Sequence, residues 1–132
     1  MSRNTDDGHA PLIEAAFDAA RAGDTTGLQH ALDRGLAPGT TNDAGDSLLM
    51  LAAYHGHAGC VTLLLEHGAD PDAVNAKGQH PLAGVSYKGD VATASALLDA
   101  GADPEGAPGA ARSPLMYAAM YNHRALTRLL LD

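Results

Sequence analysis

The sequence is poor in cysteine, in large aromatic residues and in basic residues. It has one cysteine in 132 residues, so an internal disulfide is excluded and a reducing compartment is indicated. Tryptophan is absent and phenylalanine occurs once, which favours thin layers of small side chains over one thick core. Eight basic residues against sixteen acidic ones give a net charge of −8. This balance argues against binding to nucleic-acid backbones or to anionic membranes, because both need clustered Lys and Arg.

Long apolar runs are also absent. No run approaches the roughly 18 residues that a membrane-spanning helix needs. The first residues, MSRNTDDGHAP, lack the apolar region of a signal peptide. We therefore expect a cytoplasmic protein without membrane contact. A composition rich in Ala and Gly but poor in Lys favours a bacterial source.

The sequence does contain an internal repeat of 33 residues, without insertions or deletions. Two series of residues recur at this spacing: Gly23, Gly56, Gly89 and Asn122, and Gly35, Gly68 and Gly101. The segment LLMLAAYHGHAGCVTLLLEHGADP of the second unit returns in altered form in the third and fourth units. A period of this length is typical of stacked supersecondary units, each of which cannot bury its apolar face alone.

The repeated motif resembles the ankyrin repeat, whose pattern is roughly D-x-x-G-x-T-P-L-H-x-A-A-x-x-G-H, an apolar helix ending in L-L, and then G-A-D. In the second unit the matching residues include Gly45, Leu49, Ala52, Ala53, Gly56, His57, Leu64, Leu65, Gly68, Ala69 and Asp70. The resemblance implies an all-α solenoid of four helix-turn-helix repeats joined by short hairpin-like loops. We expect a flexible tail at 1–9 and an ankyrin repeat domain at 10–132, with repeats at about 10–40, 41–73, 74–106 and 107–132.

The second unit illustrates how each repeat should be built. We expect Ser47 to cap a helix over 48–55, and a second helix over 59–67 to end at Gly68 in the left-handed conformation. Asn42 and Asn75 occupy loop positions where a side-chain oxygen can accept hydrogen bonds from local amides. The resemblance implies that the imidazoles of His57 and His123 bond to backbone and tie neighbouring layers together. Pro108 replaces Asn in the last loop, whose tip should be less regular.

Catalytic, cofactor and metal sites are not predicted. The seven histidines show no metal-ligand spacing: His9, His30, His55, His57, His67, His80 and His123. His55 and His57 lie two residues apart and could not share one side of a helix. Cys60 stands where the family usually has Ile or Val, so we interpret it as a small buried apolar residue. A redox-sensing thiol near a helix start is the alternative.

A ladder of large side chains is the main functional signal. The resemblance places two variable positions of each repeat on the concave face, just before the turn glycine. The first position is occupied by Arg21, Tyr54, Tyr87 and Met120, and the second by Ala22, His55, Lys88 and Tyr121. Tyr and Met are enriched in protein interfaces. The rows therefore indicate either a binding surface or rings that stack only on one another. Tyr117 is outside the ladder and is interpreted as replacing a core Leu.

The loop tips extend the predicted surface. The family's variable loop positions correspond to Asp43, Ala44 and Asp46, to Ala76, Lys77 and Gln79, and to Gly109, Ala110 and Arg112. Their charge changes from acidic to basic along the chain, which would orient a partner. The predicted protein-binding residues are Arg21, Asp43, Asp46, Tyr54, His55, Lys77, Gln79, Tyr87, Lys88, Arg112, Met120 and Tyr121.

The last repeat leaves a second possibility open. Leu115, Leu126, Leu129 and Leu130 are expected in a final layer without a neighbour, which Arg124 and Arg128 could shield or which could drive self-association. The sequence thus predicts a non-enzymatic protein-protein interaction module with an unknown protein partner. The alternative is an assembly element that uses the uncapped C-terminal face. We expect a monomer, with a homodimer through that face as the other case.

Overall fold

The structure is a computed structural model that describes residues 3–107, 110 and 112–131, with side chains from Pro11 onward. This part of the chain forms eight α-helices and no β-strand, with one isolated bridge between Thr41 and Ser47. The helices are α1 (Arg3–Ala22), α2 (Thr25–Asp33), α3 (Leu48–Tyr54), α4 (Ala58–Glu66), α5 (Pro81–Lys88), α6 (Val91–Asp99), α7 (Pro114–Met120) and α8 (Arg124–Leu131). None of the described helices has the length and apolar character needed to cross a bilayer.

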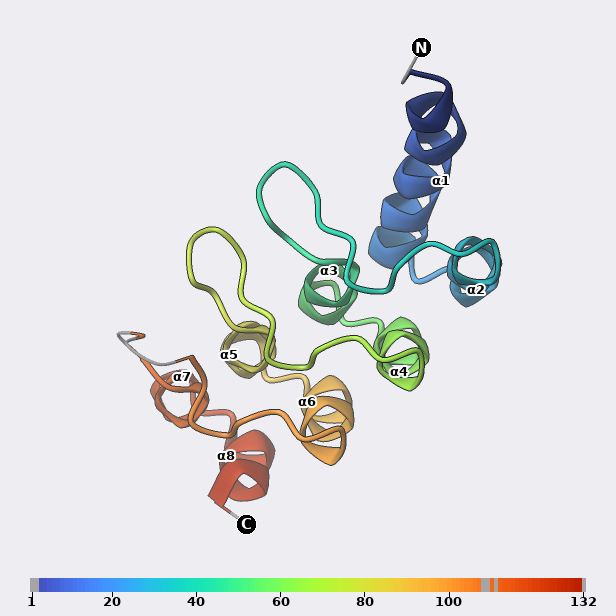
Figure 1. The fold of residues 1–132 in the computed structure, drawn as a ribbon. Coiled ribbons are helices and arrows are strands. Elements are labelled where there is room, and N and C mark those ends of the chain that lie inside the picture. The colour runs from blue at the N-terminus through green and yellow to red at the C-terminus, as the bar shows by residue number, and fades with distance from the viewer. Residues whose placement is uncertain (1–2, 108–109, 111, 132) are drawn as a thin grey trace.

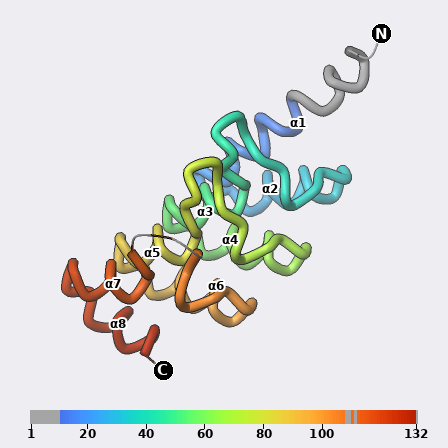
Figure 2. Tube along the Cα trace, turned by 60° about the vertical axis from the view of Figure 1, so that its left-hand side comes forward, coloured from blue at the N-terminus to red at the C-terminus, as the bar shows by residue number. Residues whose placement is uncertain are grey.

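The helices form two rows, as expected for a solenoid (Figure 1). Within each repeat the two helices pack as an antiparallel pair, and each helix also contacts its counterpart in the next repeat. The odd-numbered helices α1, α3, α5 and α7 make one row, and the even-numbered helices make the other. Loops of the second and third repeats project from the side of the odd-numbered row. The tube view shows the same stepwise stacking from one repeat to the next (Figure 2).

The N-terminal segment differs from its prediction. Helix α1 begins at Arg3, so residues 3–9 are helical where a flexible tail was expected. Polar residues do not by themselves end a helix, so the polar start of the chain can be helical. Pro11 lies inside this helix. It removes only one backbone donor, so the helix can continue through it at a local energetic cost.

Capping residues fix the boundaries of the helices in the second repeat. Ser47 Oγ accepts a hydrogen bond from the Met50 amide at 3.0 Å, which confirms the predicted N-cap of α3. Gly68 has a φ of 93° and follows α4, as predicted for a left-handed residue after a helix. His67 Nδ1–H donates to the Leu63 carbonyl at 2.9 Å, which satisfies one of the last carbonyls of α4.

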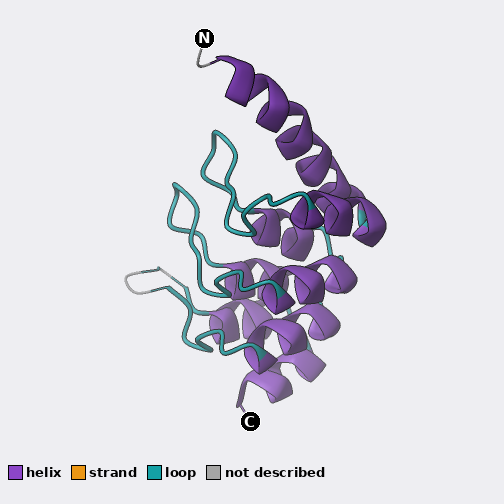
Figure 3. Cartoon of the chain, turned by 45° about the vertical axis from the view of Figure 1, so that its right-hand side comes forward, coloured by secondary structure: helices purple, strands orange, loops and turns teal. Residues whose placement is uncertain are grey.

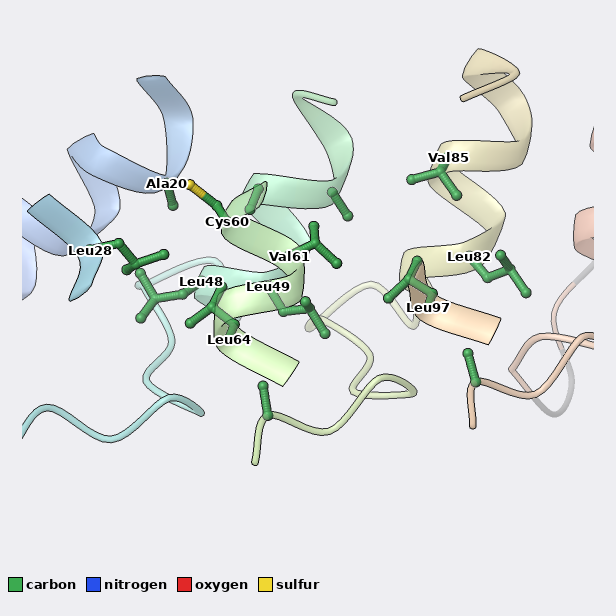
Figure 4. Close-up of a cluster of buried hydrophobic side chains, with 14 of the residues drawn as sticks. Ala20, Leu28, Leu48, Leu49, Cys60, Val61, Leu64, Leu82, Val85 and Leu97 are labelled. Atoms are coloured by element: carbon green, nitrogen blue, oxygen red, sulfur yellow. The ribbon is translucent and has the colours of Figure 1, made fainter. Parts of the chain in front are cut away.

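The core is a continuous strip of small and aliphatic side chains between the two rows. Leu28, Leu48, Leu49, Leu64, Leu82 and Leu97 are fully buried or nearly so, together with Val61 and Val85 (Figure 4). The helices have only seven to nine residues from α2 onward and would be marginal alone. Their stability must therefore come from this repeated packing.

Histidine rings connect successive repeats through the turn glycines. His57 Nε2–H donates to the Arg21 carbonyl at 2.8 Å, and His123 Nε2–H donates to the Tyr87 carbonyl at 2.9 Å. These contacts confirm the tie between layers that the resemblance implied. Each ring lies directly over a glycine of the preceding turn, because a Cβ at Gly89 would be 2.5 Å from the His123 ring. Glycine at this turn thus makes room for the next repeat.

The last repeat buries more than its sequence suggested. Leu126 is fully buried, so its assignment to an exposed final layer is wrong. Leu126 lies at the same position of its repeat as Cys60 and Thr93, which are both fully buried. Its helix, α8, packs against α6, which carries Thr93. Leu115, Leu129 and Leu130 are half-buried, and Leu131 is the exposed leucine of this face. Pro108 lies outside the described residues.

Candidate functional site

The predicted ladder forms a row of exposed large side chains on consecutive odd-numbered helices. Tyr54 is the last residue of α3, and Tyr87 lies in the last turn of α5. Met120 ends α7, and Tyr121 follows it directly. Their exposed fractions are 44% for Tyr54, 46% for Tyr87, 53% for Met120 and 48% for Tyr121. Apolar side chains of this size are normally buried, so a row of them across three repeats is an exposed apolar strip.

Part of the ladder also packs on itself. The Tyr87 and Tyr121 rings meet edge to face, with centroids 4.9 Å apart and an interplanar angle of 81°. Tyr117 adds a third ring, at 6.2 Å from Tyr87 and an angle of 88°. Tyr117 is half-buried and so is not a core residue, and our prediction that it replaces a core Leu is wrong. The equivalent positions of the two preceding repeats hold Leu51 and Gly84, which are also only half-buried.

Tyr54 has a different environment within the ladder. The Lys88 ammonium lies 4.1 Å from the centroid of the Tyr54 ring, which is a cation–π geometry. Gly84 lies beside this ring, and a Cβ built there would be at an ordinary contact distance of 3.7 Å from Tyr54 Cδ1. The structure thus brings Tyr54 and Lys88 together from two repeats. Spacing alone did not reveal this pair.

Arg21 and His55, two further polar members of the ladder, contact side chains of their own repeats. Arg21 Nη1 forms an exposed ion pair with Asp18 Oδ1 at 3.1 Å, one turn away on α1. His55 packs against Tyr54 with ring centroids 5.7 Å apart. The His55 and His57 rings are 6.4 Å apart and nearly parallel. Two residues at this spacing could not share one side of a helix, but α3 ends at Tyr54, so neither histidine lies within it.

The loops of the second and third repeats project from the same side of the chain (Figure 3), and Asn75 links them through hydrogen bonds. Its Oδ1 accepts from the amides of Lys77 and Gln79 at 3.0 and 2.9 Å. Its Nδ2 donates to Asp46 Oδ1 at 2.8 Å and to Gln79 Oε1 at 2.6 Å. Asn42 makes the equivalent local bonds to Ala44 and Asp46, so the predicted loop role of both asparagines is confirmed.

These bonds divide the predicted loop residues into two kinds. Asp46 accepts from Asn75 across the two loops, whereas Gln79 accepts from Asn75 within the same loop. Asp43 and Lys77 are exposed at the tips. Arg112 is exposed in the third loop, where Gly109 lies outside the described residues. The loops therefore present one acidic and two basic side chains in succession.

A buried polar bridge under the loops was missed by the sequence analysis. His80 is 3% exposed, and its Nε2–H donates to Asp72 Oδ1 at 2.6 Å. His80 Nδ1 accepts from the Leu82 amide at 3.2 Å, which caps α5. Asp72 Oδ1 also accepts from the Asp103 amide at 2.9 Å, so it joins two successive linkers. His80 occupies the family's Thr position, and that cap position was the available signal.

Other candidate chemistry is not assembled in the described residues. They contain no group of three or more His, Cys, Asp or Glu side chains placed to hold a metal. Cys60 is fully buried, and burial raises the pKa of its thiol, with a further contribution from the negative charge of Asp24. A raised pKa disfavours the reactive thiolate. This environment supports the prediction of a small buried apolar residue.

Two open grooves lie outside the ladder. One, of about 570 Å³, runs between α2 and α4 and has mostly polar walls that include Thr25, Asp33 and Glu66. The other, of about 500 Å³, lies on the last repeat beside Arg124, Arg128 and Leu131. Both are shallow surface features whose walls lack the enclosing apolar surface of a small-molecule site.

Comparisons with known proteins agree with the architecture. Residues 12–108 match the family model described as ankyrin repeats (3 copies). A 52-residue segment is 50% identical to the Pseudomonas aeruginosa protein named "Putative ankyrin repeat protein PA3287". This segment covers 39% of the chain and 30% of that relative's length. The similarity to this relative therefore concerns a repeat region and not a whole protein.

Proposed function

Since this chain belongs to the ankyrin repeat family, whose members are generally protein-protein interaction modules, we propose that it binds a partner protein through the ladder and the loop tips. The proposed contact residues are Arg21, Asp43, Asp46, Tyr54, His55, Lys77, Gln79, Tyr87, Lys88, Arg112, Met120 and Tyr121. The proposal is for recognition by a rigid surface without catalysis. Stacked repeats hold these side chains in place before binding, so little conformational entropy is lost on association.

The observation that carries this proposal is the exposed strip itself. Tyr54, Tyr87, Met120 and Tyr121 each expose about half of a large side chain on one face. Ring stacking accounts for the orientation of Tyr87 and Tyr121 but leaves both half exposed. Burial of such rings against a partner removes apolar surface from water, at about 25 cal/mol per Å². Clustered aromatic residues are typical of the centre of binding interfaces.

The test is affinity capture from a bacterial lysate with the wild-type chain and with Tyr54→Ala/Tyr87→Ala. We expect partners that the wild type retains to be at least tenfold depleted with the double variant, because two anchors would be lost. Circular dichroism establishes that the variant remains helical. A control variant, Val91→Ala/Leu131→Ala, removes exposed apolar side chains outside the surface and should keep the partners. Equal recovery with all three proteins would refute the proposed surface.

A second pair of substitutions separates binding from internal stacking. Tyr54→Phe/Tyr87→Phe keeps both rings and their contacts within the chain. If the rings act through apolar contact, partner recovery should change less than twofold. If only Tyr→Ala reduces recovery, while the melting temperature is unchanged, the loss comes from the interface. A large fall in thermal stability would instead assign the rings to stacking alone.

The alternative function is self-association through the C-terminal face. It is favoured by the exposure of Met116 at 52% and Leu131 at 67%, which leaves apolar surface on the last repeat. Leu126→Glu is unsuitable as a test, since a buried charge would unfold the repeat. Leu131→Glu should leave the fold intact. A mass that rises with concentration for the wild type and not for this variant would establish the alternative, whereas we propose a monomer.

Cellular placement follows the same proposal. We propose a cytoplasmic location in a bacterium, which is supported by the single buried Cys60 and by the similarity to a Pseudomonas protein. A fluorescent fusion imaged in the source cells, with fractionation as a control, tests the location. A fusion found in the periplasm or the membrane fraction would refute it.

A further inference from the structure

The proposed binding surface differs in charge from the rest of the chain. The chain carries eight basic and sixteen acidic residues. The twelve proposed contact residues include four of the basic ones, Arg21, Lys77, Lys88 and Arg112, but only two acidic ones, Asp43 and Asp46. Their balance is therefore +2 on a protein of net charge −8. Such local reversal favours a partner segment of negative charge.

Lys88 is the basic residue of this surface that contacts a ring of the ladder. Its ammonium is over the Tyr54 ring at 4.1 Å, and the next residue back along α5 is Tyr87. No ion pair to Lys88 occurs among the described residues, where the ion pairs are Arg21 with Asp18 and His80 with Asp72. An ammonium group has three donors, and contact with one ring face leaves donors for a carboxylate. The cation–π contact holds this charge beside apolar surface.

The apolar part of the surface begins next to Lys88. Tyr87 and Tyr121 meet at 4.9 Å, and Met120 is exposed beside Tyr121 in sequence. A segment bound here would contact the Lys88 cation and the aromatic strip that begins at the adjacent Tyr87. Extended polyanions fit less well, because the remaining surface of the protein is acidic and would repel them.

We propose, building on the proposed function, that the ladder recognises an acidic peptide segment with an apolar anchor. A Glu or Asp of the segment pairs with Lys88. An apolar side chain close to it covers Tyr87, Tyr121 and Met120. Lys77 and Arg112 at the loop tips add longer-range attraction for the same segment, which accelerates association at low salt.

A random 16-residue peptide library displayed on phage tests this assignment with the full chain as bait. We expect enriched peptides to share an acidic residue within about four positions of an apolar one. Synthetic copies of these peptides are then titrated against wild type, Lys88→Gln and the matched control Arg34→Gln, whose exposed cation lies outside the surface. Affinity should fall about tenfold for Lys88→Gln and less than twofold for Arg34→Gln, as expected when one charge-assisted hydrogen bond is lost.

The outcomes separate this inference from the proposed function. Peptides without acidic enrichment that are lost with Tyr54→Ala/Tyr87→Ala would overturn the acidic assignment and leave the ladder as the binding surface. Equal losses of peptide affinity for Lys88→Gln and Arg34→Gln would mean that only the net charge of the protein matters, and would also overturn the acidic assignment. A wild-type chain that enriches no peptide, or only peptides resembling its own acidic segments, would also overturn it. Capture of a whole partner in the earlier test does not depend on these results.

Discussion

The contact between Gly89 and His123 yields a prediction with an internal control. Gly89 has a φ of 76°, and a Cβ there would lie 2.5 Å from Nδ1 of His123. Gly101 has a φ of 98°, and nothing lies within 4 Å of its added Cβ. Alanine in the left-handed region costs about 1–2 kcal/mol at either position. Only Gly89→Ala must also move the ring that donates to the Tyr87 carbonyl, at about 1 kcal/mol for the hydrogen bond.

We therefore expect Gly89→Ala to lower the free energy of unfolding by about 2–3 kcal/mol, and Gly101→Ala by about 1–2 kcal/mol. Urea unfolding followed by far-ultraviolet circular dichroism measures both values, because each variant should keep the wild-type m value. In a His123→Ala background the effect of Gly89→Ala should decrease to that of Gly101→Ala, since the obstructing ring is gone.

Two results would contradict this reasoning. Equal destabilisation by Gly89→Ala and Gly101→Ala would mean that the ring relocates freely and contributes nothing. An undiminished effect of Gly89→Ala without the His123 ring would attribute the whole loss to backbone strain.

Three further measurements concern the loops, the core and the cysteine. Asn75→Ala should reduce the free energy of unfolding by about 1–3 kcal/mol, and Asn42→Ala by less, because only Asn75 donates to a second loop; equal losses in urea unfolding would refute a role for the inter-loop bond. Leu126→Ala should cost about 2–5 kcal/mol and Leu131→Ala less than about 0.5 kcal/mol, and comparable thermal shifts would show that the last repeat does not bury Leu126 as described. Burial raises the pKa of the Cys60 thiol. The contribution of this neutral thiol to the free energy of unfolding is therefore complete below about pH 8.5 and declines as the pH rises through the pKa of the folded state. Relative to Cys60→Ala, the wild type should lose up to about 1.4 kcal/mol between pH 7.5 and about pH 9.5 in urea unfolding, and parallel pH profiles would contradict this.

Much of the fold could be predicted because the 33-residue period carries it. Glycine at the first three turns and a Ser before α3 and α7 mark boundaries by local backbone chemistry. The observed α3 and α4 differ from the predicted ranges by about one residue. Leu126 was misassigned because its burial depends on contact with the preceding repeat and not on whether another repeat follows. Comparison with Thr93 and Cys60, one and two repeats earlier in the chain, would have identified it as inward-facing.

The candidate site was predictable in position but not in its contacts. Spacing placed Tyr54 and Tyr87 on equivalent turns, and their exposure agrees with that register. The pairing of Lys88 with Tyr54 depends on the side-chain rotamers of two residues in different repeats. The bond from Asn75 to Asp46 likewise requires two loops to lie at one separation, which no local pattern encodes. Residues 3–9 contain no apolar side chain, so no helical periodicity was available there to predict helix.

The turn residue of the fourth repeat affects how such an array could be lengthened by design. At the turns of the first and third repeats, glycine lies beneath the ring of the following unit, whereas position 122 holds an asparagine with a φ of 59°. Its Cβ points into the space that an incoming imidazole would occupy. A duplicated copy of a unit bearing the His57 ring could therefore be joined in register only with glycine at position 122. The residue at this one turn position therefore determines which repeat units can be added after it, by gene duplication or by protein engineering.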